Sequence, residues 1–263
     1  MRVYGIDFTC NPSRRKPVTC AVCEIDNSRL RCEQVLSWPS KKFTDFEALL
    51  GSEGPWIMGI DAPFGLSKTF IHDIDWPLNW EEYIKKLEMI DRRHFKGFLK
   101  GYRDTRPLGH KEHKRAVDKL VRSMSPQNIR VSGMFFEVSK RIMASPANIP
   151  PIRKKNCDRI IVETYPGVFA RRLIGNDGYK DGNLEESIKK QSDLRAQILS
   201  ALPDVEAPPD VVVDSNGDKL DAVLCAVQAA WAWSKREENF GIPETADPLE
   251  GWIVDGSLYE AAA

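Results

Sequence analysis

The sequence lacks the long apolar runs that membrane proteins need. No run approaches the roughly 18 apolar residues of a membrane-spanning helix. The N-terminus enters a predicted strand directly, with no apolar signal region, so we expect a cytoplasmic protein. Hydrophobic residues still make up 42% of the 263 residues, which is enough to bury a core. We therefore expect a globular protein in which residues 1–263 form a single domain.

The chain is also poor in cysteine, with six in 263 residues, which excludes a disulfide-rich scaffold. The pair Cys20-x-x-Cys23 has the spacing of half a zinc site. However, it lies in a predicted strand, where residues three apart point to opposite faces. The sequence contains no second pair of this kind, so it gives little support for zinc.

The net charge of the chain is zero, but basic and acidic residues are unevenly distributed along it. Residues 92–159 contain 18 basic and five acidic residues, a net charge of +13 for this span. Solvated helical surfaces account for part of such an excess. The remainder indicates a polyanionic ligand.

Two apolar runs of the sequence end in the same tripeptide, Gly-Ile-Asp. The first is Val3–Phe8, which contains Asp7, and the second is Trp56–Leu66, which contains Asp61. A weaker third copy, Arg159–Glu163, ends in an acid as well. Each run predicts a buried strand, and α/β sheets carry their chemistry at the carboxyl ends of strands. A single acid at this place could simply cap the next turn, but three acids on neighbouring strands would converge.

The rest of the pattern predicts an α/β fold. Residues 2–8, 17–25 and 29–38 predict an antiparallel meander of three strands, with a hairpin turn at Asp26-Asn27-Ser28. A short helix at 46–50 then leads to the strand at Trp56, which suggests a parallel crossover. Segment 67–151 is expected to be a basic, mostly helical insertion, with its best helices at 80–99 and 111–124. Further expected elements are helices at 166–173, 185–202 and 214–236 and a short last strand at 251–254.

Two acids begin the predicted helix at 214–236. Asp218 and Asp221 are three residues apart and therefore share one face of the helix. Acids are favoured at the positive end of a helix dipole, which is a sufficient reason for Asp218. Asp221 is harder to explain in this way, because the apolar run Ala-Val-Leu-Cys follows it directly.

These features together resemble the ribonuclease-H-like superfamily. The segments Gly-Ile-Asp-Ala-Pro-Phe-Gly-Leu, Val-Glu-Thr-Tyr-Pro-Gly and Asp-Lys-Leu-Asp-Ala are similar to those of a poorly characterised family of predicted nucleases with that fold. The resemblance extends from Val3 to about Trp233. It implies a mixed five-stranded sheet, order 3-2-1-4-5, with helices on both faces. It also implies an active site made of Asp7, Asp61, Glu163 and Asp221, with Asp218 as a further candidate ligand.

Carboxylates that converge without a counter-charge repel one another and raise each other's pKa. A divalent cation removes this conflict, and ligation by oxygen alone selects Mg²⁺ or Mn²⁺. Two such ions could support hydrolysis of a phosphodiester bond, with Asp7 on the central strand as the bridging ligand. Basic residues of the insertion would hold the nucleic acid. The candidates are Arg92, Arg93, Arg103, Arg106, Lys111, Lys114 and Arg115.

Other interpretations of the sequence remain open. Actin-like kinases and ATPases also use an acid on the first strand, but their phosphate loops need glycine, which the loop after Asp7 lacks. A non-catalytic nucleic-acid-binding module is a third alternative. Trp76, Trp80 and Tyr102 could stack on bases or belong to the core. His110-x-x-His113 could bind a metal or face solvent.

Overall fold

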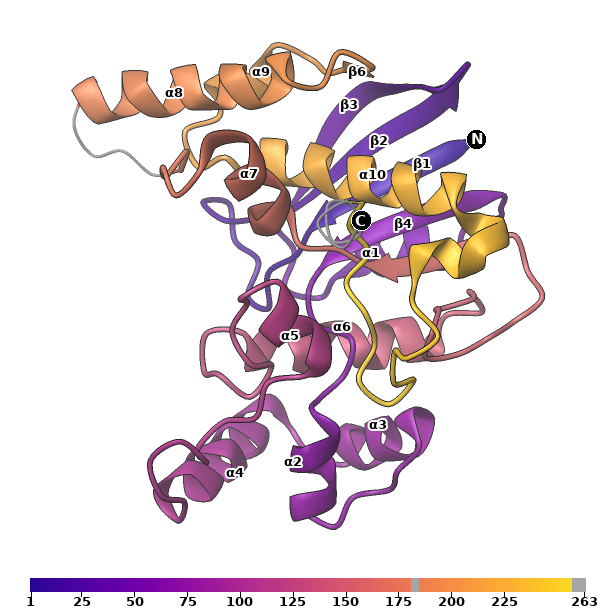
Figure 1. Ribbon diagram of the computed structural model, residues 1–263, viewed down its shortest axis with the longest axis vertical. Coiled ribbons are helices and arrows are strands. Elements are labelled where there is room, and N and C mark those ends of the chain that lie inside the picture. Colours follow the sequence, from indigo (N-terminus) through magenta and orange to yellow (C-terminus); the bar gives the residue numbers. More distant parts are fainter. Residues whose placement is uncertain (181–184, 257–263) are drawn as a thin grey trace.

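A mixed six-stranded sheet forms the centre of the computed structural model, which describes residues 1–180 and 185–256. Its strands are β1 (Arg2–Asp7), β2 (Val18–Asp26), β3 (Arg29–Trp38), β4 (Trp56–Asp61), β5 (Arg159–Glu163) and β6 (Val205–Glu206). They lie in the order β6-β3-β2-β1-β4-β5 (Figure 1). Strand β1 pairs antiparallel with β2 and parallel with β4, so the predicted meander and crossover are both present.

The predicted order of five strands is incomplete, because β6 adds a sixth strand in parallel beside β3. This strand has two residues and lies among prolines, so no periodic pattern indicates it. The expected last strand at 251–254 is not formed. Its Ile253 makes an isolated bridge with Glu163 instead.

Helices cover both faces of the sheet. The first face carries α10 (Asp218–Ser234), which runs across β1, β2 and β4, together with α7 (Pro166–Ile174) and α8 (Glu185–Ser200) (Figure 1). The opposite face carries α1 (Thr44–Leu50), α2 (Lys68–Asp73), α3 (Trp80–Glu88), α4 (Arg92–Asp104) and α6 (Ser132–Ala144). Short helices α5 (Ala116–Leu120), α9 (Asp210–Val213) and η1 (Arg236–Gly241) complete the described secondary structure. None of the described helices is long and apolar enough to cross a membrane.

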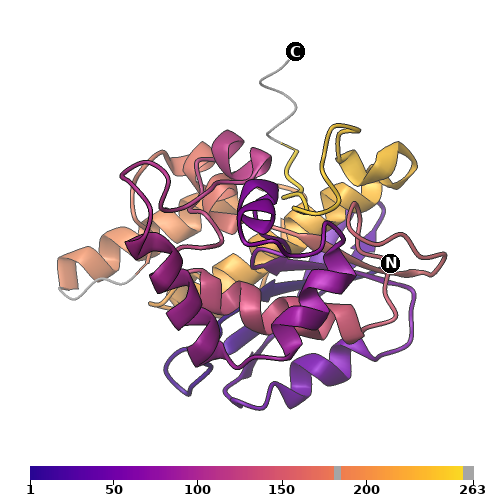
Figure 2. The same ribbon diagram turned by 90° about the horizontal axis from the view of Figure 1, so that it is seen from below.

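The insertion between β4 and β5 is helical as expected, but its helices are shorter than the sequence suggests. The helix predicted at 80–99 is two helices, α3 and α4, because Asp91 interrupts it and its side chain accepts a hydrogen bond from the His94 amide at 2.8 Å. The helix predicted at 111–124 is reduced to α5. Apolar residues of the insertion, such as Phe95 and Phe135, share one buried cluster with Ile6 and Ile60 of the sheet. Seen from below, these helices lie in front of the sheet (Figure 2).

Candidate metal centre

Asp7 and Asp61 end neighbouring strands and lie directly beside each other. The two residues are partners in the parallel register of β1 and β4. Side chains alternate along a strand, so both acids share the face of Val3 and Ile57, which pack into the apolar cluster under α10. The prediction that these two carboxylates converge is therefore confirmed.

The glycine of each Gly-Ile-Asp segment lets α10 lie on the bare backbone of the strands. Gly5 and Gly59 are also partners in register. A Cβ atom on Gly5 would lie 2.0 Å from the carbonyl oxygen of Ala222, and one on Gly59 would lie 2.5 Å from that of Cys225. No side chain fits in this space, so the two glycines permit the close approach that brings Asp221 of α10 to the strand ends.

The carboxylates of Asp7, Asp61 and Asp221 form one acidic triad. Each offers an oxygen, and the three oxygens lie within 4.8 Å of one another. Asp7 and Asp221 are only 5% and 3% exposed, whereas Asp61 is half-buried. The Oδ2 atom of Asp7 is buried and has no hydrogen-bond partner among the described residues. A buried carboxylate oxygen without a donor is costly, and a cation at the triad would satisfy it. The triad could therefore hold a metal ion.

Burial raises the pKa of all three triad carboxyls above the usual value for aspartic acid. The pKa of Asp61 rises to about 7, mainly through burial and secondarily through the negative charge of Asp221. Burial likewise raises the pKa of Asp7 and of Asp221, although the nearby Lys180 opposes each shift. The site thus disfavours three negative charges unless positive charge is added.

Three side chains that the sequence did not indicate already contact the acids. The Lys180 ammonium group and the Tyr179 hydroxyl both donate to Asp221, the latter at 2.5 Å. The Lys16 ammonium group donates to Asp218 at 2.9 Å. Lys16 belongs to a loop whose basic character is visible in the sequence, whereas nothing in the polar stretch around Tyr179 and Lys180 marks them out.

Asp218 lies beside the triad but is not part of it. It is 3% exposed, and its Oδ2 atom is buried without a hydrogen-bond partner among the described residues. It lies three residues before Asp221 on α10, and its negative charge contributes to the raised pKa of Asp7. Asp218 is thus a candidate for outer contacts to a bound ion or its water.

Glu163 does not join the triad. It is the register partner of Ile60, one residue before Asp61, and Ile60 faces the helices of the insertion. Because a shift of one residue turns a side chain to the other face of a sheet, the register places Glu163 on the opposite face from Asp7 and Asp61, although its charge still contributes to the raised pKa of Asp61. The expected convergence of three strand-end acids therefore holds for two of them.

Glu163 instead forms a buried ion pair with Arg115. The guanidinium donates to Glu163 at 2.6 and 2.9 Å and to Asp118 at 2.9 and 3.0 Å, and the side chains of all three residues are at most 2% exposed. The amide of Phe64 donates to Glu163 as well, at 3.0 Å. Glu163 thus already has a cationic partner in the protein, which it shares with Asp118.

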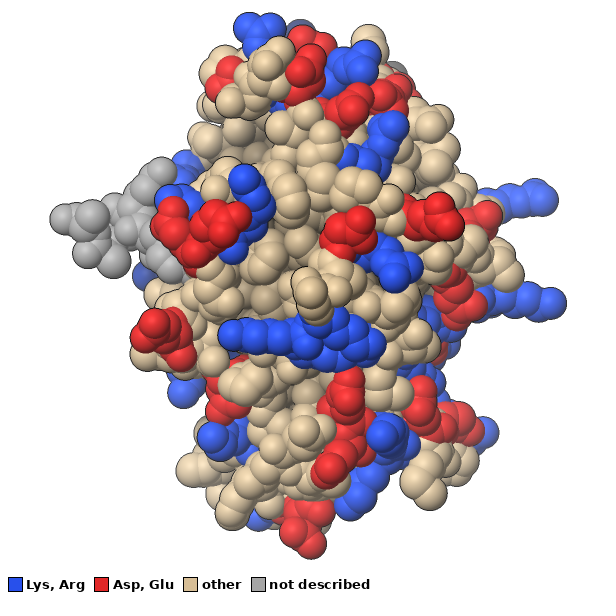
Figure 3. Space-filling model, turned by 90° about the vertical axis from the view of Figure 1, so that its right-hand side faces the viewer, with Lys and Arg blue, Asp and Glu red and all other residues tan. Residues whose placement is uncertain are grey.

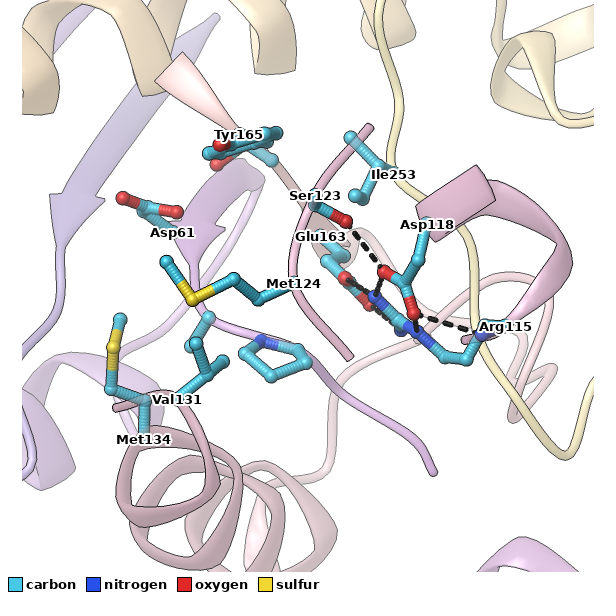
Figure 4. Close-up of a pocket in the computed structure, with 13 residues that line it drawn as sticks. Asp61, Arg115, Asp118, Ser123, Met124, Val131, Met134, Glu163, Tyr165 and Ile253 are labelled. Atoms are coloured by element: carbon cyan, nitrogen blue, oxygen red, sulfur yellow. Dashed lines mark hydrogen bonds and ion pairs between the residues drawn. The ribbon is translucent and has the colours of Figure 1, made fainter. Parts of the chain in front are cut away.

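A cavity of about 180 Å³ separates Asp61 from this ion pair. Asp61 lies on one side of the cavity and Arg115, Asp118 and Glu163 on the other, with Met124 between them (Figure 4). Apolar side chains form much of the remaining wall: Val131, Met134 and Ile253. Of the triad, Asp61 therefore borders a partly apolar cavity.

The basic residues predicted to bind nucleic acid have different surroundings. Three of them are exposed: Arg93, Lys111 and Lys114. Three are half-buried and form ion pairs: Arg92 with Glu137 (3.2 Å), Arg103 with Glu112 (2.7 Å) and Arg106 with Asp73 (3.7 Å). Arg115 is 1% exposed and donates to Glu163, Asp118 and the Glu250 carbonyl, so it is not part of a surface for nucleic acid. On the face shown in Figure 3, basic and acidic side chains are interspersed.

Other candidates from the sequence belong to the framework. Trp80 and Tyr102 are buried in the core, which favours packing over base stacking. His113 contacts the Tyr102 hydroxyl at 2.8 Å. Cys20 and Cys23 lie in apolar clusters on opposite faces of the sheet, as the strand period predicts.

The fold and the triad define an α/β protein with a candidate carboxylate metal centre. Residues 5–246 match the model of a family described as "Protein of unknown function (DUF429)", and the chain belongs to that family. No curated protein and no solved structure matches the chain. The description of the family states no activity, so the function has to be argued from the site.

Proposed function

We propose that this protein is a metal-dependent nuclease of the ribonuclease-H-like type, which hydrolyses phosphodiester bonds with Mg²⁺ or Mn²⁺ held by Asp7, Asp61 and Asp221. The observation that carries the proposal is the buried triad, in which one Asp7 oxygen has no partner within residues 1–180 and 185–256. Ligands that are all oxygen favour these two hard cations over zinc. A bound ion of this kind would polarise a phosphoryl oxygen and lower the pKa of an attacking water.

The surrounding residues fit this role. Asp7 and Asp221 are buried and fixed by the strand and the helix, whereas Asp61 is half-buried and faces the cavity. A substrate phosphate would therefore approach from the Asp61 side. Lys16 is 54% exposed in its side chain and sits at the edge of the acids, where its charge suits a phosphate oxygen. A second ion, as in two-metal enzymes, would have Asp218 as a further ligand.

The direct test is to measure Mn²⁺ binding and cleavage of fluorescent DNA and RNA strands by the wild type and by Asp7→Asn. We expect saturable Mn²⁺ binding and metal-dependent cleavage in the wild type, and loss of both in the variant. Asp193→Asn, which changes an exposed acid on α8, is the matched control and should retain both. Cleavage by Asp7→Asn at the wild-type rate would refute the proposal.

One observation favours a different function, that of a non-catalytic nucleic-acid-binding module. Lys180 and Lys16 already form ion pairs with Asp221 and Asp218, and such pairs could replace a metal ion. The same titration separates the two functions. A module of this type would bind strands but show no saturable Mn²⁺ binding, whereas the nuclease requires the ion.

A further inference from the structure

A second cavity, of about 350 Å³, lies away from the triad on the helical insertion. It is lined by α4 and by residues 127–132, the segment that leads into α6. Its volume falls in the range of small-ligand pockets. Three cations and one acid contribute to its wall: Lys96, Lys100, Arg103 and Asp104.

The three cations are presented together by the spacing of α4. Lys96, Lys100 and Arg103 occupy positions i, i+4 and i+7, which bring them onto one side of the helix. Arg103 is held by Glu112 at 2.7 Å. Lys96 and Lys100 form no ion pair with any described residue, so their charges are available to a ligand.

Two of the residues that line the same cavity carry buried donors without partners among the described residues. The side-chain carbonyl of Gln127 accepts a hydrogen bond from the His113 amide at 2.6 Å, which fixes the Nε2 group as the free end. Within the described residues, neither this Nε2 group nor the Ser132 hydroxyl has a hydrogen-bond partner, and the two residues are 1% and 0% exposed. Buried polar groups in proteins are nearly always paired, so the two donors indicate an acceptor supplied by a ligand.

Residues beside this cavity also pack against the loop that follows Asp7. A Cβ atom on Gly133, next to Ser132, would lie 2.7 Å from the Cys10 sulfur and 3.8 Å from Cε of Lys96. Arg92 of α4 donates to the Cys10 carbonyl. Residues next to the cavity lining therefore pack against Cys10, which lies three residues beyond the triad acid Asp7.

We propose that this cavity binds a phosphate group, with the Gln127 amide and the Ser132 hydroxyl as donors and Lys96 and Lys100 as counter-charges. Two N–H or O–H donors together with cations suit an anion that has several acceptor oxygens. The phosphate could belong to a nucleic acid backbone or to a small phosphorylated molecule. The site requires no metal at the triad, so it can be tested independently of the nuclease.

The test is calorimetric titration, in EDTA, with inorganic phosphate and separately with a five-nucleotide single strand. The informative variants are Gln127→Glu and Lys100→Gln. Gln127→Glu keeps the acceptor for the His113 amide but replaces the donor by a negative oxygen, and Lys100→Gln removes a charge. Lys86→Gln, which changes an exposed lysine on α3, is the matched control.

We expect saturable phosphate binding that Gln127→Glu and Lys100→Gln each weaken roughly tenfold, while Lys86→Gln changes it less than twofold. A strand that binds more tightly than phosphate and loses affinity in the same variants would identify the source as nucleic acid. Equal affinity for both would identify a small phosphorylated molecule. The proposal would be overturned if neither probe binds, or if both informative variants bind the probes as tightly as the wild type does. Asp7→Asn should retain phosphate binding, so failure of the nuclease proposal can be distinguished from failure of the phosphate-site proposal.

Discussion

Glu163 and Asp7 are both buried acids at strand ends, yet their partners differ. Glu163 has a guanidinium and an amide as donors, whereas one oxygen of Asp7 has no donor in the part of the chain that the structure describes. Asp118 still compensates the charge of Arg115 when Glu163 is replaced, but glutamine has only one acceptor oxygen for the donors that face Glu163. We therefore predict that Glu163→Gln lowers the free energy of unfolding by roughly 1–3 kcal/mol, because it leaves a buried donor without an acceptor, but does not change Mn²⁺ affinity. Denaturant unfolding and Mn²⁺ titration measure the two effects.

The control for this prediction is Glu33→Gln. It removes an exposed ion pair with Arg2 (2.6 Å) and should lower the free energy of unfolding much less than Glu163→Gln does, because exposed ion pairs contribute little. If folded Glu163→Gln instead lost Mn²⁺ binding while keeping its stability, Glu163 would be a metal ligand after all.

Asp61 gives a second prediction at the scale of one residue. Its pKa is about 7 in the folded protein, compared with 3.8 when unperturbed. The folded state therefore holds a proton between about pH 4 and 7 that the unfolded state releases, and stability falls as the pH rises through this window. Asp61→Asn removes this loss, so metal-free Asp61→Asn should have a higher Tm than the wild type at pH 8 and a smaller advantage at pH 5. Calorimetry in EDTA checks this, and parallel pH profiles for the two proteins would contradict it.

The position of α10 on the sheet determines whether the triad exists. Gly5→Ala places a methyl group against the Ala222 carbonyl and must displace the helix. We predict a loss of roughly 1–3 kcal/mol in stability and at least a tenfold loss of Mn²⁺ affinity, although no carboxylate has been removed. Unfolding and Mn²⁺ titration measure both quantities.

Gly97→Ala is the matched control for Gly5→Ala, because a Cβ atom on Gly97 meets nothing within 4 Å. Gly97 lies inside α4, so alanine should be neutral or stabilise the helix by up to about 1 kcal/mol. Unchanged Mn²⁺ affinity in folded Gly5→Ala would show that the triad does not depend on the close approach of α10.

Elements with a strong local pattern could be predicted from the sequence. Strands β1 and β4 are apolar runs with sharp turn signals, and their shared Gly-Ile-Asp segment correctly placed Asp7 beside Asp61. The register of β5 could not be predicted, because it depends on pairing between strands about 100 residues apart, and an error of one residue reverses the face of Glu163. Lys180 was missed for a similar reason, since its contact with Asp221 is made only by tertiary packing.

At the scale of the whole molecule, the positive charge excess of the insertion is weaker evidence for a polyanionic ligand than the sequence alone suggests. Part of the positive charge is internal, as in the Arg115 ion pair, and part is compensated on the surface, as in Arg103 with Glu112. Glu250 ties the insertion to the C-terminal segment, because it accepts hydrogen bonds from the amides of Lys68 (2.7 Å) and Ala116 (3.0 Å). These two hydrogen bonds join the insertion to the C-terminal segment, in addition to the apolar cluster that the insertion shares with the sheet.

Metal binding should therefore be visible in the stability of the entire chain. An ion that binds only the folded state stabilises it by about 2.7 kcal/mol at a concentration of 100 times Kd. The triad must lose its protons to bind the ion, and Asp61 does so near pH 7. We predict that saturating Mn²⁺ raises Tm more at pH 8 than at pH 5.5, and that Asp7→Asn shows neither shift. Scanning calorimetry with and without EDTA measures this. An equal rise at both pH values, or the same rise in Asp7→Asn, would place the bound ion elsewhere on the protein.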